Sequence, residues 1–234
     1  MEDIIRLDPE KILTTIEKLN LRIEDRFPDS NLLKVCRQFL VVAKKTKSNI
    51  DWISNPNVML RVSSYLIILI GLAALVYSVT FVDWELENTT IVNLVSLSEA
   101  IFNDILLLGA AVFFMMSLES RIKRKRASKA LNDLRVLVHV LDMHQLTKDP
   151  TIDVKSKNDT EHSPRRTFTK LELIRYLDYC SETTALVSKV SALYSQSLPD
   201  AVVVSAVNEI EVLCTGLNQK IWQKVMILEN RSRD

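Results

Sequence analysis

The sequence predicts an all-α integral membrane protein, and three observations support this fold class. The chain has 234 residues but only three glycines, where average usage of about 7% would give roughly sixteen. Tight hairpins and phosphate-binding loops need residues that tolerate positive φ, so this scarcity favours helices over sheets. The other two observations are a long apolar run at residues 62–82 and a second one at residues 101–118.

Residues 1–60 are expected to form a cytoplasmic pair of amphipathic helices. Asp8 followed by Pro9 is a helix-start signal. A break at residues 27–30 precedes the second helix, which we expect to end in the basic stretch 44–47. Neither helix is apolar for long enough to cross a bilayer, so the two should pack on each other or on the C-terminal region. The first helix has apolar residues at helical spacing: Ile12, Ile16, Leu19 and Ile23.

The two apolar runs are the candidates for membrane-spanning helices. Residues 62–82 carry no charge, and at about 1.5 Å per residue they match the ~30 Å hydrocarbon thickness of a bilayer. The run at 101–118 is also long, but it includes Asn103 and Asp104. Together they predict a two-pass transmembrane helical hairpin.

The positive charges around the runs predict how this hairpin is oriented. No Lys or Arg occurs between Arg61 and Arg121, whereas basic residues flank both outer sides of the pair. The positive-inside rule then places both termini in the cytoplasm and the connection outside. A cytoplasm-first topology of this kind suits a bacterial inner (plasma) membrane. The expected boundaries are 61–120 for the membrane region, about 62–82 and 99–119 for its helices, and 83–98 for the outside connection.

A cluster of basic residues directly follows the second apolar run. Taken alone it resembles a nucleic-acid patch, but 30 Lys and Arg are balanced by 29 Asp and Glu over the chain, which gives no global attraction to nucleic acid. Its position instead predicts a cytoplasmic stop that fixes topology and meets anionic lipid headgroups, at about 1 kcal/mol per basic residue. The cluster consists of Arg121, Lys123, Arg124, Lys125 and Arg126.

The chain after the membrane region is expected to be helical, with one interruption. Without Pro or Gly from residue 110 until Pro150, the second membrane helix can continue to about Leu146, which makes residues 121–147 a cytoplasmic stalk. Residues 148–168 form a polar linker. The stalk carries an apolar stripe that needs partners: Leu131, Leu134, Val138 and Leu141.

Residues 169–230 are expected to form a C-terminal helical hairpin, which completes a cytoplasmic bundle. Thr169 and Glu172 match a capping box at the start of the first helix. The final helix shows near-heptad periodicity typical of antiparallel helix pairs and coiled coils. Its stripe is Val203, Val207, Ile210, Cys214, Leu217, Ile221, Val225 and Leu228, and the preceding helix carries Leu173, Leu177, Cys180, Val187, Val190 and Tyr194.

A polar patch near the start of the second membrane run is the best candidate site. Glu99 and Asn103 share one helix face, and Asp104 is displaced by about 100° from Asn103. Ionisable groups deep in a bilayer often mark ion or proton paths. The alternative is that the helix enters the hydrocarbon only near Asp104, so that the acids reach the outer headgroup layer.

Catalytic, cofactor and metal sites are not predicted. Nucleotide-binding and nucleophile-elbow motifs are absent from the sequence. His139 and His144 are five apart and point to different faces of a helix, unlike a zinc-binding i, i+4 pair. The cysteines (Cys36, Cys180 and Cys214) are far apart in the sequence and are expected to be packing residues.

The sequence therefore favours an interaction protein over an enzyme. We expect a membrane-anchored helical scaffold that contacts the bilayer and either copies of itself or another helical protein, with no nucleic acid partner. Trp222 is a candidate interface residue, although packing within the C-terminal hairpin is an equal alternative. The competing function is a subunit of a homo-oligomeric ion or proton channel or transporter that uses Glu99 and Asp104.

Overall fold

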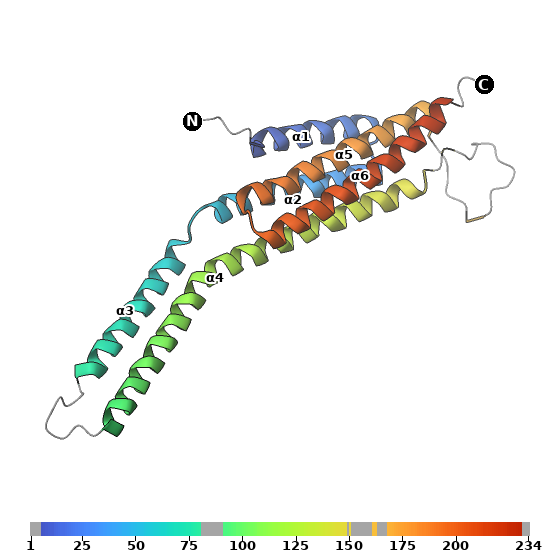
Figure 1. Cartoon of the computed structure of the whole chain (residues 1–234). Helices are drawn as coiled ribbons and strands as arrows, with labels where there is room; N and C mark the ends of the chain where they lie inside the picture. Colours follow the sequence, from blue (N-terminus) through green and yellow to red (C-terminus); the bar gives the residue numbers. More distant parts are fainter. Residues whose placement is uncertain (1–5, 81–90, 149, 151–160, 163–167, 231–234) are drawn as a thin grey trace. The chain divides into compact units, whose positions relative to one another are not determined.

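The computed structural model describes residues 6–80, 91–148, 150, 161–162 and 168–230, and every regular element within these ranges is an α-helix (Figure 1). This confirms the all-α prediction. The elements are α1 (Pro9–Arg26), α2 (Asn31–Ser54), α3 (Val58–Thr80), α4 (Ile91–Leu146), α5 (Lys170–Ser197) and α6 (Ala201–Asn230).

The helices divide into two compact units. Met1–Ser54 together with Arg124–Asp234 form one unit, which we call the helical bundle, and Asn55–Lys123 form the other, which we call the hairpin unit. α4 contributes to both, because Arg124 is the first of its residues that belongs to the bundle. The stretch expected to form a separate stalk is therefore largely a part of the bundle.

α1 and α2 start at polar caps, as their sequences indicate. The Asp8 carboxylate accepts hydrogen bonds from the first free amides of α1, at 2.9 and 3.4 Å, and the Ser30 hydroxyl accepts one from Leu33 N at 3.1 Å. The expected end of the second helix at the basic stretch is wrong. α2 continues to Ser54, because Ile50 and Ile53 are buried and hold its last turns against the core.

α5 is the central helix of the bundle and packs against α1, α2 and α6. The predicted capping box of Thr169 and Glu172 is confirmed. The predicted apolar side is buried except for Leu173, which is half-buried. Further residues make this buried side wider than predicted, and Thr183 and Thr184 donate to main-chain carbonyls within the helix. The additional buried residues are Tyr176, Tyr179, Thr183, Thr184, Leu186 and Leu193. The far side of α5, which includes Leu171, Arg175 and Lys189, is exposed.

α6 follows α5 after a short turn and runs antiparallel to it (Figure 1). This pairing with α5 brings the predicted near-heptad stripe of α6 onto the bundle core, and all eight stripe residues are buried. The expected packing of the N-terminal helices is also confirmed, since α1 packs on α2 and both pack on α5.

The last part of α4 is held in the bundle by apolar and polar contacts. Its predicted stripe, from Leu131 to Leu141, is at most 1% exposed. Arg135 forms an ion pair with Glu209 of α6. At the end of α4, Lys224 Nζ donates to the carbonyl of Gln145 at 2.8 Å and to its side-chain oxygen at 2.6 Å, which satisfies a helix C-terminal acceptor with a positive charge.

The hairpin unit consists of α3 and the first part of α4. A Cβ atom added at Gly71 would lie 2.9 Å from Leu108 Cδ1, so α3 and α4 approach closely at this glycine. α4 begins at Ile91, so residues 91–98 are helical, although we expected them in the connection. The rest of that connection, and most of the expected polar linker, lie outside the described residues.

Length and composition identify two helices of the described chain as long and apolar enough to cross a membrane. One is Phe102–Leu146 in α4, where none of the apolar window is buried. The other is Ala201–Asn230, where 28% of the window is buried. In α3, the described apolar stretch Arg61–Ala73 is shorter than either of these two helices.

Candidate functional site

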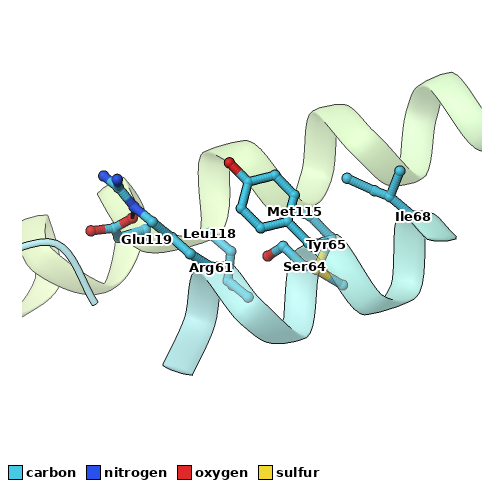
Figure 2. Close-up of a pocket in the computed structure, with 7 residues that line it drawn as sticks. All are labelled: Arg61, Ser64, Tyr65, Ile68, Met115, Leu118 and Glu119. Atoms are coloured by element: carbon cyan, nitrogen blue, oxygen red, sulfur yellow. Dashed lines mark hydrogen bonds and ion pairs between the residues drawn. The ribbon is translucent and has the colours of Figure 1, made fainter. Parts of the chain in front are cut away.

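A groove of about 230 Å³ lies between α3 and α4 in the hairpin unit (Figure 2). Arg61 and Glu119 lie at one end of it, and Ile68 lies towards the other (Figure 2). The groove therefore has a charged end and an apolar end. Its polar lining residues are Arg61, Ser64, Tyr65 and Glu119, and its apolar ones are Ile68, Met115 and Leu118.

Glu119 joins the start of α3 to α4 at the charged end of the groove. Its carboxylate accepts hydrogen bonds from Asn57 N at 3.1 Å and from Arg61 Nε at 3.1 Å, and it lies 2.9 Å from Lys123 Nζ. Lys123 also donates to the carbonyl of Asn55 at 2.9 Å. This role of Glu119 could not be predicted from the sequence, because Asn57 and Arg61 are about sixty positions away and no local pattern links them to Glu119.

Arg124, the next basic residue, has its partner in the bundle. Its Nε and one terminal nitrogen donate to Asp200 Oδ2 at 2.9 and 2.6 Å, and the other Asp200 oxygen accepts from Val202 N at 3.0 Å. Asp200 thus caps α6 while it pairs with α4. The hydrogen bond from Arg124 is the main reason that the pKa of Asp200 lies below its usual value.

Arg126 is the third member of the cluster with a specific partner. Its Nε donates to Asn49 Oδ1 at 2.9 Å, and its guanidinium carbon lies 4.5 Å from the centre of the Trp52 ring. The Asn49 amide in turn donates to the Tyr194 hydroxyl at 3.3 Å. The Tyr194 hydroxyl then donates to Thr46 Oγ1, also at 3.3 Å. This chain of polar contacts connects α4, α2 and α5 inside the bundle.

Arg121 and Lys125 differ from the rest of the basic cluster. Both are exposed, and neither has a hydrogen bond or an ion pair to another described residue. The structure thus divides the cluster into three residues with structural partners and two that are open to solvent or headgroups. The sequence could not show this division, because Asp200 and Asn49 are more than seventy positions from their partners.

Glu99, Asn103 and Asp104 are all exposed on the first part of α4. Among the described residues, no group of three His, Cys, Asp or Glu side chains is arranged to hold a metal ion. His139 is exposed and His144 is half-buried, both in the bundle part of α4. The structure therefore brings neither the polar patch nor the histidines together with further ligands in the part of the chain that it describes.

Trp222 lies on the outer side of α6, where it is 63% exposed. Trp222 is therefore not packed between α5 and α6, which was one of the two alternatives for this residue. Further large apolar residues of α6 are also exposed, among them Val212 at 73% and Met226 at 40%. They give the bundle an apolar outer surface beside the buried stripe.

The three cysteines are buried and free, as expected for packing residues. Cys36 Sγ lies 3.3 Å from the Thr183 hydroxyl in the core. Burial raises the pKa of Cys36 and of Cys214 to about 11. Both thiols therefore stay protonated near neutral pH, and a protonated thiol is a poor nucleophile and metal ligand.

No protein-family model matches the chain, and neither does any curated protein or solved structure. A functional proposal therefore has to rest on the contacts, charges and apolar surfaces of this chain alone.

Proposed function

We propose that the chain is a membrane-anchored helical interaction protein, in which the hairpin unit inserts into a lipid bilayer and the bundle contacts other proteins. The observation that carries this proposal is the exposure of large apolar side chains on α4. Phe102, Leu107 and Phe113 are 66%, 65% and 73% exposed. Exposing so much apolar surface to water is costly, at about 25 cal/mol per Å². Lipid hydrocarbon would remove that cost.

We assign the two membrane spans to residues 62–82 and 99–119, and not to α6. Although α6 passes the same length and composition test, its apolar stripe is buried against the bundle core. A helix in this position already has a protein partner for its apolar side. The apolar window of α4 has none of its residues buried, which favours lipid as its surroundings.

The proposed topology follows from the charges that bracket the hairpin. Lys and Arg are absent between Arg61 and Arg121, so both ends of the hairpin are expected on the cytoplasmic side. We propose an integral protein of a bacterial inner (plasma) membrane with both termini in the cytoplasm.

The bundle is the part that we propose contacts other proteins. The exposed apolar residues Val212, Trp222 and Met226 of α6 are of the kind that anchors helix-helix interfaces, with Trp as the strongest. Either a second copy of the chain or another helical protein suits such a surface. Catalysis, cofactors and nucleic acid have no part in the proposal.

Membrane insertion is tested by fractionation of the full-length protein. We expect it to remain in the membrane pellet after alkaline carbonate extraction. A variant in which residues 55–123 are replaced by a flexible linker should move to the soluble fraction. Release of the full-length protein by carbonate would contradict the proposal.

The topology is tested with the two basic residues that have no structural partner. Replacing Arg121 and Lys125 by Gln removes positive charge from the cytoplasmic flank and leaves the contacts of Lys123, Arg124 and Arg126 in place. We expect a mixed orientation of the hairpin in reporter fusions at the C-terminus. Replacing Lys34 and Arg37 of α2 by Gln is the control. If this control disturbs the orientation as much as the replacement of Arg121 and Lys125, the proposed stop function is wrong.

A second candidate function, a subunit of a homo-oligomeric ion or proton channel, is favoured by one observation. Asn103 and Asp104 are exposed on the proposed membrane part of α4 and have no polar partner among the described residues. Polar groups at such a position need partners, which other copies could supply. Ion flux in liposomes that depends on Asp104, and is lost in Asp104→Asn, would support this candidate.

A further inference from the structure

The groove in the hairpin unit has the polarity of a lipid molecule. Its charged end is formed by Arg61 and Glu119, and its other lining residues include Ile68, Met115 and Leu118. At the proposed inner membrane surface, a lipid likewise places a charged headgroup next to an apolar chain. This match rests on the proposed membrane insertion of the hairpin unit.

Arg61 keeps part of its hydrogen-bonding capacity for a ligand. Its Nε donates to Glu119, while its two terminal nitrogens have no partner among the described residues, and the side chain is 56% exposed. A guanidinium held at Nε presents these two nitrogens as a planar pair. That geometry suits the two oxygens of a phosphate group.

Tyr65 adds a third donor one helical turn further along α3. It is 70% exposed, and its hydroxyl has no partner in the described part of the chain. Figure 2 shows that the Arg61 guanidinium and the Tyr65 hydroxyl project to the same side of the groove. Residues four apart lie on one helix face, so a single headgroup can reach both.

The charges near this end favour an anion. Arg61 and Lys123 both contact Glu119, so this group of three carries one net positive charge. Glu119 is already surrounded by donors from Asn57, Arg61 and Lys123, so it is not open to a cationic headgroup.

A second apolar surface further along α3 is where we place the rest of an acyl chain. A second groove, of about 480 Å³ and with an apolar lining, lies further along the same helix and is lined by Leu69, Leu72, Ala73, Val76 and Tyr77. Ile68 and Leu72 are four residues apart and share a face with Tyr65. From Arg61 to Val76 the helix rises about 22 Å at 1.5 Å per residue, which is comparable to the length of a lipid chain.

We propose that the hairpin unit binds one anionic phospholipid of the inner leaflet. Its phosphate contacts the terminal nitrogens of Arg61 and the hydroxyl of Tyr65, and one acyl chain lies against Ile68, Met115 and the apolar groove of α3. A free phosphate ion would use only the charged end and would leave the apolar part of the groove unfilled.

The test is a lipid titration of the full-length protein in mild detergent, followed by native mass spectrometry. The probes are phosphatidylglycerol, phosphatidylcholine and inorganic phosphate. We expect one saturable site for phosphatidylglycerol, weaker binding of phosphatidylcholine, and no displacement by an equal concentration of inorganic phosphate. Displacement by inorganic phosphate would show a simple anion site and would overturn the proposal.

Two variants and one control locate the site. Arg61→Gln should weaken phosphatidylglycerol binding about tenfold, because a charge-assisted contact is lost. Tyr65→Phe should weaken it about threefold, and this variant keeps the Arg61 contact with Glu119, so it does not depend on the stability of the hairpin. Arg121→Gln removes the same charge outside the groove and should change binding less than twofold.

The outcomes separate this inference from the membrane proposal. Equal affinities in wild type, Arg61→Gln and Tyr65→Phe would overturn the lipid site. An equal loss in Arg121→Gln and Arg61→Gln would do the same, because it would show attraction to charge in general. If carbonate extraction releases the wild-type protein, both proposals fail. If the protein stays in the membrane but retains no phospholipid, only the lipid site fails.

Discussion

α4 and α6 are both long and apolar enough to cross a membrane, yet they differ in where their apolar residues lie. In α6 the stripe from Val203 to Leu228 is buried, and its outer face is mixed. In the first part of α4 the large apolar residues, such as Phe102 and Phe113, are exposed instead. Two helices that pass the same test of length and composition can therefore differ in how far a protein core covers their apolar residues. The arrangement of apolar residues around each helix is what separates them.

The same contrast exists within α4 itself. Before Arg124 the helix belongs to the hairpin unit, and after it to the bundle. In the bundle part, the stripe from Leu131 to Leu141 packs in the core, while Val136 and Met143 on other sides of the helix are exposed. One continuous helix thus has an all-round apolar part and an amphipathic part, with the basic cluster at the junction.

The largest effect is expected from a charge placed in the buried stripe of α6. Ile210→Lys puts an ammonium group at a position with 0% exposure, which should cost about 3–5 kcal/mol, because the charge has no partner there. Thermal unfolding followed by circular dichroism measures this loss. Val212→Lys, at a position that is 73% exposed, is the matched control and should leave the melting temperature nearly unchanged. A similar loss in both variants would contradict the assignment of α6 to the core.

The next effect concerns the exposed apolar part of α4. Leu107→Arg should oppose membrane insertion by about 2.5–3.5 kcal/mol, the cost of a charge near the centre of a membrane helix. We expect a larger soluble or aggregated fraction on carbonate extraction. Val136→Arg, an exposed position in the bundle part of α4, should fractionate as wild type. Normal insertion of Leu107→Arg would place this part of α4 outside the hydrocarbon.

A smaller effect is expected at the junction, where Arg124 pairs with Asp200. Arg124→Gln should lower the free energy of unfolding by about 1 kcal/mol at neutral pH. The pair holds the pKa of Asp200 below its usual value. Its contribution is therefore complete above the unfolded-state pKa, about 3.9, and is lost as the pH falls through the lower folded-state pKa. The difference between variant and wild type should shrink in acid.

The control for this pair is Lys125→Gln, which removes an adjacent exposed charge. It should show no such pH-dependent difference. Urea unfolding at pH 7 and at acid pH measures both variants. An Arg124→Gln loss that is constant over this range would show that the ion pair with Asp200 is not its cause.

The smallest effect on stability is expected at the outer face of α6. Trp222→Gln changes a residue that is 63% exposed, so the free energy of unfolding should change by less than about 0.5 kcal/mol. Self-association or partner binding should nevertheless weaken, because exposed Trp residues often dominate interfaces. Analytical ultracentrifugation in detergent measures the self-association. Gln219→Ala on the same helix is the control, and an equal effect of the two would argue against a role for Trp222.

Local sequence patterns predicted much of the fold but little of the groove. The capping box at Thr169 and the stripe of α6 depend on residues three or four apart, so they can be read directly. The end of α2 was misjudged because Ile50 and Ile53 follow a basic stretch and are helical only with the support of the core. Glu119 lies on α4, whereas its partners Asn57 and Arg61 lie just before α3 and in its first turn, and no spacing in the chain relates them.

The sequence itself determined the helix content, the apolar runs, the interval without Lys or Arg between Arg61 and Arg121, and the apolar stripes. They depend on neighbours within a turn or on simple composition. Only the tertiary structure decided that α5 packs against three other helices, that α4 joins the bundle, and that Arg124 and Arg126 have partners while Arg121 and Lys125 do not. The physical reason is that helical periodicity states which side of a helix is apolar, whereas the neighbour of that side is chosen by packing among distant segments.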